Sequence, residues 1–203
     1  MDEEIEVKFL LADLHAYRQK LSQIGAELVG KRVFEYNLRF DRPDGSLAAA
    51  RQILRLRQDE HACLTFKGLG IVEDEVLKRT EIEFEVSDFS AAQRFLEILG
   101  YQVFTVYEKY RQIWLLDGVA VSVDEMPYGC FTELEGPDGG TLKKVAEKLD
   151  LDWKERINQS YLALLSVYKL KTGNKAKRLT FADFEGVKVN PEDLGLHSAD
   201  KQR

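Results

Sequence analysis

The sequence predicts an α+β protein built around an antiparallel β-sheet, and two observations support this class. Eight segments alternate between apolar and charged or polar residues with a period of two, which is typical of strands with two different faces. Short turn signals such as Asp117-Gly118 join several of these segments, and turns of this length connect antiparallel neighbours, whereas parallel strands need longer crossovers. We therefore expect one antiparallel α+β domain.

The first strand is expected over residues 4–11. Ile5, Val7 and Phe9 occupy one parity there, and charged residues occupy the other. The same reasoning places the remaining strands at about 27–40, 51–58, 61–67, 78–86, 101–116, 119–124 and 129–136.

Four helices are expected between and after these strands. The first follows Asp13, a suitable N-cap, and ends at Gly25. Apolar residues at helical spacing predict three more helices, at 90–99, 140–150 and about 154–169.

The periodic patterns end near Lys171, and this point divides the chain. Residues 1–170 are expected to form the folded domain and residues 171–203 a C-terminal tail, because the tail has no sustained period. We expect the tail to be loose rather than docked through Phe181 and Phe184.

The composition limits the classes of function. The 203 residues include 29 Lys+Arg and 35 Asp+Glu, and a net charge of −6 disfavours sequence-blind binding to nucleic acid. No run approaches the roughly 20 apolar residues of a membrane span, and the acidic N-terminal sequence is unlike a signal peptide. Cys63 and Cys130 make no metal or disulfide framework. We expect a cytoplasmic monomer or homodimer without nucleic-acid or membrane partners.

The polar parity of the predicted strands carries formal charges. Its bases are Lys8, Arg55, Arg57, Lys67, Arg79, Lys109 and Arg111. Its acids are Glu4, Glu6, Glu81, Glu83, Glu85, Asp124, Glu133 and Glu135. A solvated face is the simpler interpretation of any single strand. However, carboxylates are depleted in strands, and like charges on neighbouring strands repel unless something binds between them. We therefore expect this face to curl inward and line a cavity.

Such a cavity suits a polyphosphate. Oxygen ligands without His or Cys favour Mg²⁺ or Mn²⁺ over zinc. The arginines Arg55 and Arg57, like the pair Lys109 and Arg111, can neutralise phosphate oxygens. Metal ligands and bases on one surface therefore predict a site for a triphosphate. His15, His61 and His197 are scattered, and we expect no metal or catalytic role for them.

The charged segments also resemble the motifs of the CYTH superfamily, the triphosphate tunnel metalloenzymes. Residues 4–8 resemble its ExExK signature, and LRLRQ, TFKG, RTEIEFE, EKYR, SVDEMPYG and TELEG follow in the family's order. The stretch LDWKERINQSYLALL resembles the closing helix of class IV adenylate cyclases. The resemblance implies an eight-stranded antiparallel β-barrel with helices packed outside, forming a tunnel for a triphosphate and a divalent metal, Mg²⁺ or Mn²⁺.

The resemblance assigns roles to the matching residues. It implies that Glu4, Glu6 and Lys8 are catalytic. The metal ligands it implies are Glu4, Glu6, Glu133 and Glu135, supported by Glu81, Glu83 and Asp124. The phosphate-binding residues it implies are Lys8, Arg55, Arg57, Lys67, Arg79, Lys109 and Arg111.

One segment departs from the family pattern. Where many members read D-x-Y-F-D, this chain reads Asn37-Leu-Arg-Phe-Asp41, so Arg39 replaces an aromatic residue. Some relatives activate water with a Lys–Tyr pair. Tyr36 lies near the corresponding place, but its parity does not assign it as the base.

Three functions are compatible with these residues. The first is metal-dependent hydrolysis of the terminal phosphate of tripolyphosphate, a nucleoside triphosphate or thiamine triphosphate. The second is class IV adenylate cyclase chemistry, in which the ribose 3′-hydroxyl attacks the α-phosphorus and pyrophosphate leaves. The third is a non-catalytic polyphosphate- or nucleotide-binding module, and the complete set of acids argues against it.

Overall fold

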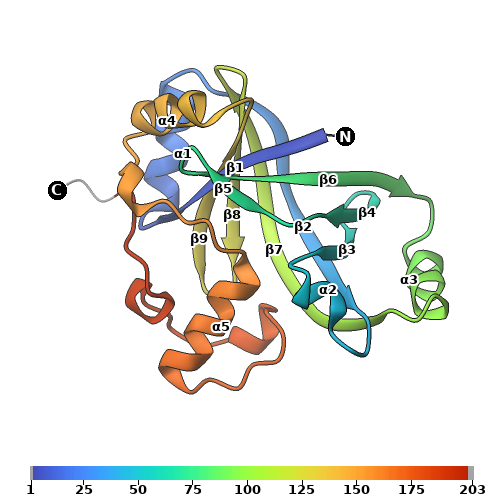
Figure 1. Ribbon diagram of the computed structural model, residues 1–203. Helices are drawn as coiled ribbons and strands as arrows, with labels where there is room; N and C mark the ends of the chain where they lie inside the picture. The colour runs from blue at the N-terminus through green and yellow to red at the C-terminus, as the bar shows by residue number, and fades with distance from the viewer. Residues whose placement is uncertain (1, 201–203) are drawn as a thin grey trace.

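A single antiparallel sheet that closes on itself forms the centre of the computed structural model, which describes residues 2–200 (Figure 1). Its strands are β1 (Asp2–Leu11), β2 (Glu27–Asp41), β3 (Ile53–Gln58), β4 (Ala62–Lys67), β5 (Ile71–Glu73), β6 (Val76–Val86), β7 (Gln102–Leu116), β8 (Val119–Met126) and β9 (Gly129–Glu135). The strand order is β1-β9-β8-β7-β2-β3-β4-β6-β5, and a further pairing of β1 with β6 closes a ring of eight strands. β5 lies outside the ring and pairs with β6.

The predicted fold class is confirmed, because the ring is antiparallel and helices lie outside it. All eight predicted strands are present, with ends that differ by a few residues. β5 was not predicted, because its three exposed residues are too few to show a period.

The helices are α1 (Leu14–Gln23), α2 (Ser46–Ala49), α3 (Phe89–Ile98), α4 (Gly139–Lys148) and α5 (Tyr161–Thr172). Short 3₁₀ turns are η1 (Trp153–Glu155), η2 (Ala182–Phe184) and η3 (Pro191–Leu194). Asp13 caps α1 as predicted, by accepting a hydrogen bond from the backbone N–H of Ala16. α1 and α4 bury Leu21 and Val145 against β1, β8 and β9, which gives the ring its main external core.

The last helix begins later than the sequence predicts. The backbone N–H of Ile157 donates to the carbonyl of Lys8 at 2.8 Å, so this part of the chain is held as an extended bridge against β1. Ser160 then caps α5. As a result, α5 covers one end of the ring and brings Tyr161 to its interior (Figure 1).

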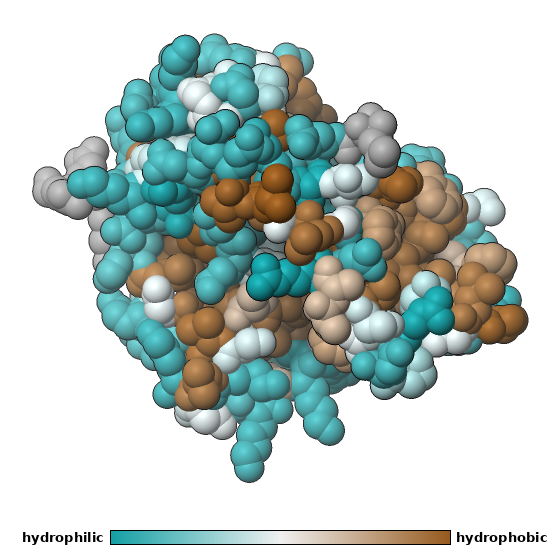
Figure 2. Space-filling model, viewed as in Figure 1, coloured by the Kyte–Doolittle hydropathy of each residue, from teal (hydrophilic) through white to brown (hydrophobic). Residues whose placement is uncertain are grey.

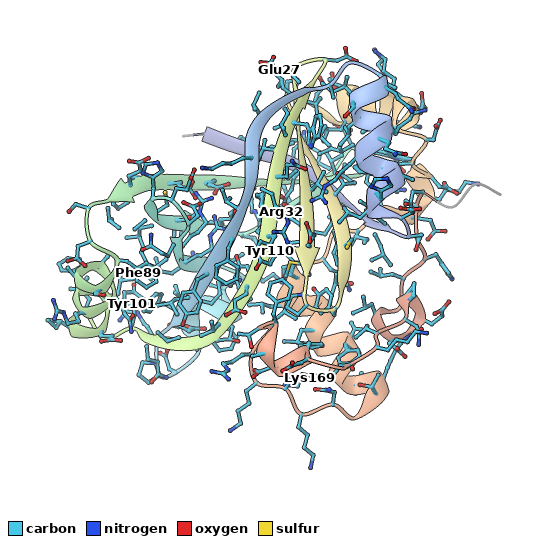
Figure 3. The ribbon with its side chains drawn as sticks, turned by 180° about the vertical axis from the view of Figure 1, so that it is seen from behind. Glu27, Arg32, Phe89, Tyr101, Tyr110 and Lys169 are labelled. Carbon is cyan, nitrogen blue, oxygen red and sulfur yellow. The ribbon has the colours of Figure 1, made fainter. Side chains whose placement is uncertain are left out.

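The segment after α5, which the sequence analysis expects to be loose, lies against the ring in the structure. Leu179 forms a parallel bridge with Tyr107, on a stretch of β7 that β8 does not reach. Phe184 and Leu194 are buried beside α5. On the outer face of β2 and β7, Arg32 lies over the ring of Tyr110 (Figure 3), and the ring of Phe181 packs against the same tyrosine.

The outer face of the ring is not covered everywhere. Leu54 and Leu56 of β3 pack under Leu96 of α3. Ile82 and Phe84 of β6 are 51% and 53% exposed, and hydrophobic side chains gather on this part of the surface (Figure 2). Within residues 2–200, no helix is long and apolar enough to cross a membrane.

Candidate functional site

The charged parity of the strands points into the ring. Three contacts join strands that are not neighbours, which only inward-pointing side chains can do. Lys67 Nζ of β4 lies 2.6 Å from Glu4 Oε1 of β1, with β6 between them. Arg55 of β3 donates to the hydroxyl of Tyr107 on β7 at 3.3 Å, across β2. Arg111 of β7 contacts Glu133 of β9, across β8.

Acidic residues of β1 and β6 gather at one wall of the ring. Glu4 accepts hydrogen bonds from Lys67 Nζ at 2.6 Å and from Arg79 Nε at 2.7 Å. Arg79 also donates to Glu6 at 2.8 Å, and Lys67 lies 3.0 Å from Glu81. This wall therefore contains three of the predicted metal ligands, and each is held by a base.

Glu135 lies beside these acids at the rim of the ring, opposite Glu6 in register. Loss of hydration raises the pKa of Glu135 to about 7, and the carboxylates of Glu4, Glu6 and Glu81 contribute, against the opposing effect of Lys67. Crowded carboxylates of this kind fit a divalent cation, which would relieve their repulsion. Among the described residues, however, no group of three metal-ligating side chains is assembled in a geometry ready for a metal.

A second cluster lies deeper in the ring. Lys8 Nζ lies 2.9 Å from Glu133, and Asp124 accepts hydrogen bonds from Lys109 at 3.0 Å and from Arg111. The hydroxyl of Tyr161 donates to Asp124 at 2.7 Å.

Burial opposes the charge on Glu133, but Lys8 and Arg111 hold its pKa well below the usual range. Asp124 is fully buried, so the bases around it must compensate its charge.

Glu35 is an interior acid that the sequence analysis missed. It is 1% exposed, and its carboxylate lies 3.5 Å from both Lys109 Nζ and Arg57 Nη1. Burial disfavours its charge, but the bases Lys109, Arg111 and Arg57 lower its pKa to about 2. The alternation of Glu35, Asn37 and Arg39 on β2 is the signal that would have found it.

Arg55 and Arg57 of β3 meet Glu83 of β6. Glu83 accepts hydrogen bonds from Arg55 at 3.1 Å and from Arg57 at 3.0 Å. Glu85 is one of the acids predicted to face inward, but it is exposed and lines a cavity of about 320 Å³ at the rim with Cys63 and Arg57. It lies at the rim because it pairs with Cys63, one residue from the point where β4 begins and β6 ends.

The structure therefore brings the predicted site residues together around one interior, with Glu83 and Glu135 exposed, and their roles remain predictions. Glu4, Glu6, Glu81 and Glu135 share one wall, and Asp124 and Glu133 lie deeper. The seven predicted phosphate-binding bases all line the ring, and each contacts a carboxylate.

A closed antiparallel ring with an interior of paired acids and bases defines a charged tunnel protein. The CYTH domain matches residues 2–179, and the chain belongs to this family. It is 29% identical over 132 residues to adenylate cyclase CyaB of Aeromonas hydrophila, which covers 64% of this chain and 67% of that protein.

Solved structures show the same fold. An adenylate cyclase candidate from Vibrio parahaemolyticus aligns with a TM-score of 0.71 at 22% identity, over 80% of this chain and 97% of that one. HpAC1 from Hippeastrum, described as having a dominant triphosphatase activity, aligns with a TM-score of 0.62 at 19% identity. That alignment covers 96% of this chain and 100% of that one.

Proposed function

We propose that this protein hydrolyses the terminal phosphate of a triphosphate, in a reaction that depends on a divalent metal. The observation that carries this proposal is the lining of the tunnel. The charged groups of the tunnel contact the aromatic side chains of Tyr107 and Tyr161, and both tyrosines are engaged. Tyr107 accepts a hydrogen bond from Arg55, and Lys8 Nζ lies 4.3 Å from the ring centre of Tyr161. The lining thus suits phosphate groups better than a nucleobase.

The carboxylates of Glu4, Glu6, Glu133 and Glu135 would hold Mg²⁺ or Mn²⁺, with Glu81, Glu83 and Asp124 in support. Their oxygen atoms are the ligands that these hard cations prefer. The metal would supply charge neutralisation on phosphate oxygens.

The bases then have a second task. Lys67 and Arg79 contact Glu4 in the structure. A cation at Glu4 would release both side chains, and their charges would become available to phosphate oxygens. Arg55, Arg57, Lys109 and Arg111 line the other side of the tunnel and can bind the rest of the phosphate chain.

The second candidate function is adenylate cyclase chemistry. It is favoured by the likeness to CyaB of Aeromonas hydrophila and to the Vibrio parahaemolyticus protein. HpAC1 of Hippeastrum supports the hydrolase, since its description names triphosphatase activity as dominant.

One assay distinguishes the candidates. The purified protein is incubated with Mg²⁺ or Mn²⁺ and with tripolyphosphate, ATP or thiamine triphosphate, and the products are separated. Orthophosphate is the expected product. Cyclic AMP with pyrophosphate would establish the cyclase instead, and tight triphosphate binding without any product would leave a binding module.

A further inference from the structure

Arg39 differs from every other base in the tunnel. It lies on β2 with the inward parity of Glu35 and Asn37, opposite Arg55 on β3 and Thr105 on β7. Each of the seven other inward bases contacts a carboxylate. Within residues 2–200, Arg39 has no ion pair and no hydrogen bond from its side chain, and its Nε atom is buried without a partner.

Asp41, the nearest acid along the same face, makes no ion pair or hydrogen bond with Arg39 in the described structure. Asp41 accepts hydrogen bonds from the backbone N–H groups of Arg42 at 2.7 Å, Leu47 at 2.9 Å and Ala48 at 3.0 Å. These bonds commit its carboxylate to the start of α2. The cations Arg55 and Arg79 oppose the charge of Arg39, while Tyr107 and Asp41 favour it, but no carboxylate of the described residues forms an ion pair with it.

A second unpaired group lies two residues away on the same face. Asn37 is fully buried, and neither its amide nitrogen nor its amide oxygen has a hydrogen-bond partner in the described structure. Of the seven buried side-chain atoms without a hydrogen-bond partner in the described residues, six belong to β2 and β3, and the seventh is the indole nitrogen of Trp114. Buried polar atoms are almost always paired, so this concentration indicates a place where a ligand makes the bonds.

The chemistry of the group defines the ligand. The guanidinium of Arg39 presents a planar set of donors that matches two phosphate oxygens, and the Asn37 amide adds a further donor. The seven other inward bases are neutralised by protein carboxylates, whereas the charge of Arg39 is available to a phosphate group.

We propose that Arg39, together with Asn37, binds a phosphoryl group of the substrate and supplies a larger share of triphosphate affinity than the predicted family set implies. This inference rests on the proposed function for the identity of the ligand. Arg39 is then a binding residue of this chain at a position where many CYTH proteins carry an aromatic side chain.

The test measures binding apart from turnover. Isothermal titration calorimetry with Mg²⁺ and bis-imidotriphosphate, in which NH groups replace the bridging oxygens of tripolyphosphate, compares the wild-type protein, R39Q and R94Q. Arg94 is an exposed base of α3 and serves as the matched control. We expect R39Q to bind at least fivefold more weakly and R94Q to bind within twofold of the wild type. Any smaller effect of R39Q, or an equal effect of R94Q, overturns the inference.

Thermal unfolding without the analogue separates a binding role from a structural one. R39Q removes a partly buried charge that has no ion-pair partner, so its melting temperature should equal or exceed that of the wild type. N37D should give Arg39 a carboxylate partner. It should therefore raise the melting temperature and lower the affinity for the analogue at least fivefold. If R39Q does not fold, R39M is held to the same binding criterion. Lower stability with unchanged affinity would make Arg39 structural.

The outcomes also separate this inference from the proposed function. If the wild type releases orthophosphate and R39Q binds the analogue as tightly as the wild type does, the role of Arg39 is overturned but the hydrolysis is not. Analogue binding that depends on Arg39, without phosphate release from any triphosphate, overturns the hydrolysis alone. A wild type that neither binds the analogue nor releases phosphate from any triphosphate overturns both.

Discussion

Replacing Glu35 by Gln should destabilise the protein strongly at neutral pH. Glu35 is 1% exposed, and its charged form is favoured by Lys109, Arg57 and Arg111. Its pKa is about 2 in the folded protein, against an ordinary value of 4.5. Since one pKa unit corresponds to roughly 1.4 kcal/mol, the charged carboxylate contributes about 3 kcal/mol to stability at pH 7.

The sign of the pH dependence follows from the lowered pKa. The unfolded chain takes up a proton at Glu35 before the folded protein does, so the contribution is complete above about pH 5 and is lost as the pH falls toward 2. By linkage, only about 1 kcal/mol of it should remain at pH 3. Glutamine keeps the size of the side chain but does not titrate, so the two proteins should converge in acid.

The assay is urea unfolding of the wild type and E35Q at pH 7, 4 and 3, followed by circular dichroism. E60Q is the control, because Glu60 and Lys31 form an ion pair on the surface, 2.6 Å apart, with both side chains more than half exposed. It should leave the unfolding midpoint unchanged. A difference between wild type and E35Q that is constant from pH 7 to pH 3 would refute the reasoning, because it would assign the effect to packing rather than charge.

Three further predictions concern the tunnel. E4Q or E6Q should abolish metal-dependent triphosphate hydrolysis, while the circular dichroism spectrum remains that of a folded protein. Unchanged turnover in both variants would contradict the assignment of Glu4 and Glu6 as metal ligands. R57A should raise the KM for the triphosphate about tenfold with a smaller change in kcat, as expected for the loss of a charge-assisted hydrogen bond. An unaltered KM would count against Arg57 as a phosphate ligand. Y161F should lose about 1–2 kcal/mol of stability in urea unfolding, because the hydroxyl of Tyr161 donates to the buried Asp124. A wild-type midpoint for Y161F would show that this hydrogen bond makes no net contribution.

The sequence predicted the ring because its charges obey strand parity. Ile5, Val7 and Phe9 are buried outside the ring against helices, while Glu4 and Lys8 point inside, as the alternation predicted. The inward orientation of the charged side chains could be inferred from the local pattern. A shift of one residue in strand register would place every charge of that strand in the apolar core.

Other features depend on contacts that no local pattern contains. The docking of Leu179 on β7 follows from a gap in pairing that only the assembled ring has. The delayed start of α5 follows from the bridge between Ile157 and Lys8, which are far apart in the chain. Glu35 could have been predicted from the sequence, since it shares its parity with Arg39. The unpaired state of Arg39 becomes visible only in the structure, where each of the other inward bases contacts an acid.

The pairing of β1 with both β6 and β9 has a consequence for synthesis on the ribosome. Both partners of β1 follow it far along the chain, so one edge stays open until β6 has been made and the other until β9, which ends at Glu135, has been made. Contacts of such long sequence separation make folding slow, and unpaired strand edges invite association with other chains. Ring closure is thus a late step, and protection of the nascent β1 by chaperones should govern the yield of folded protein.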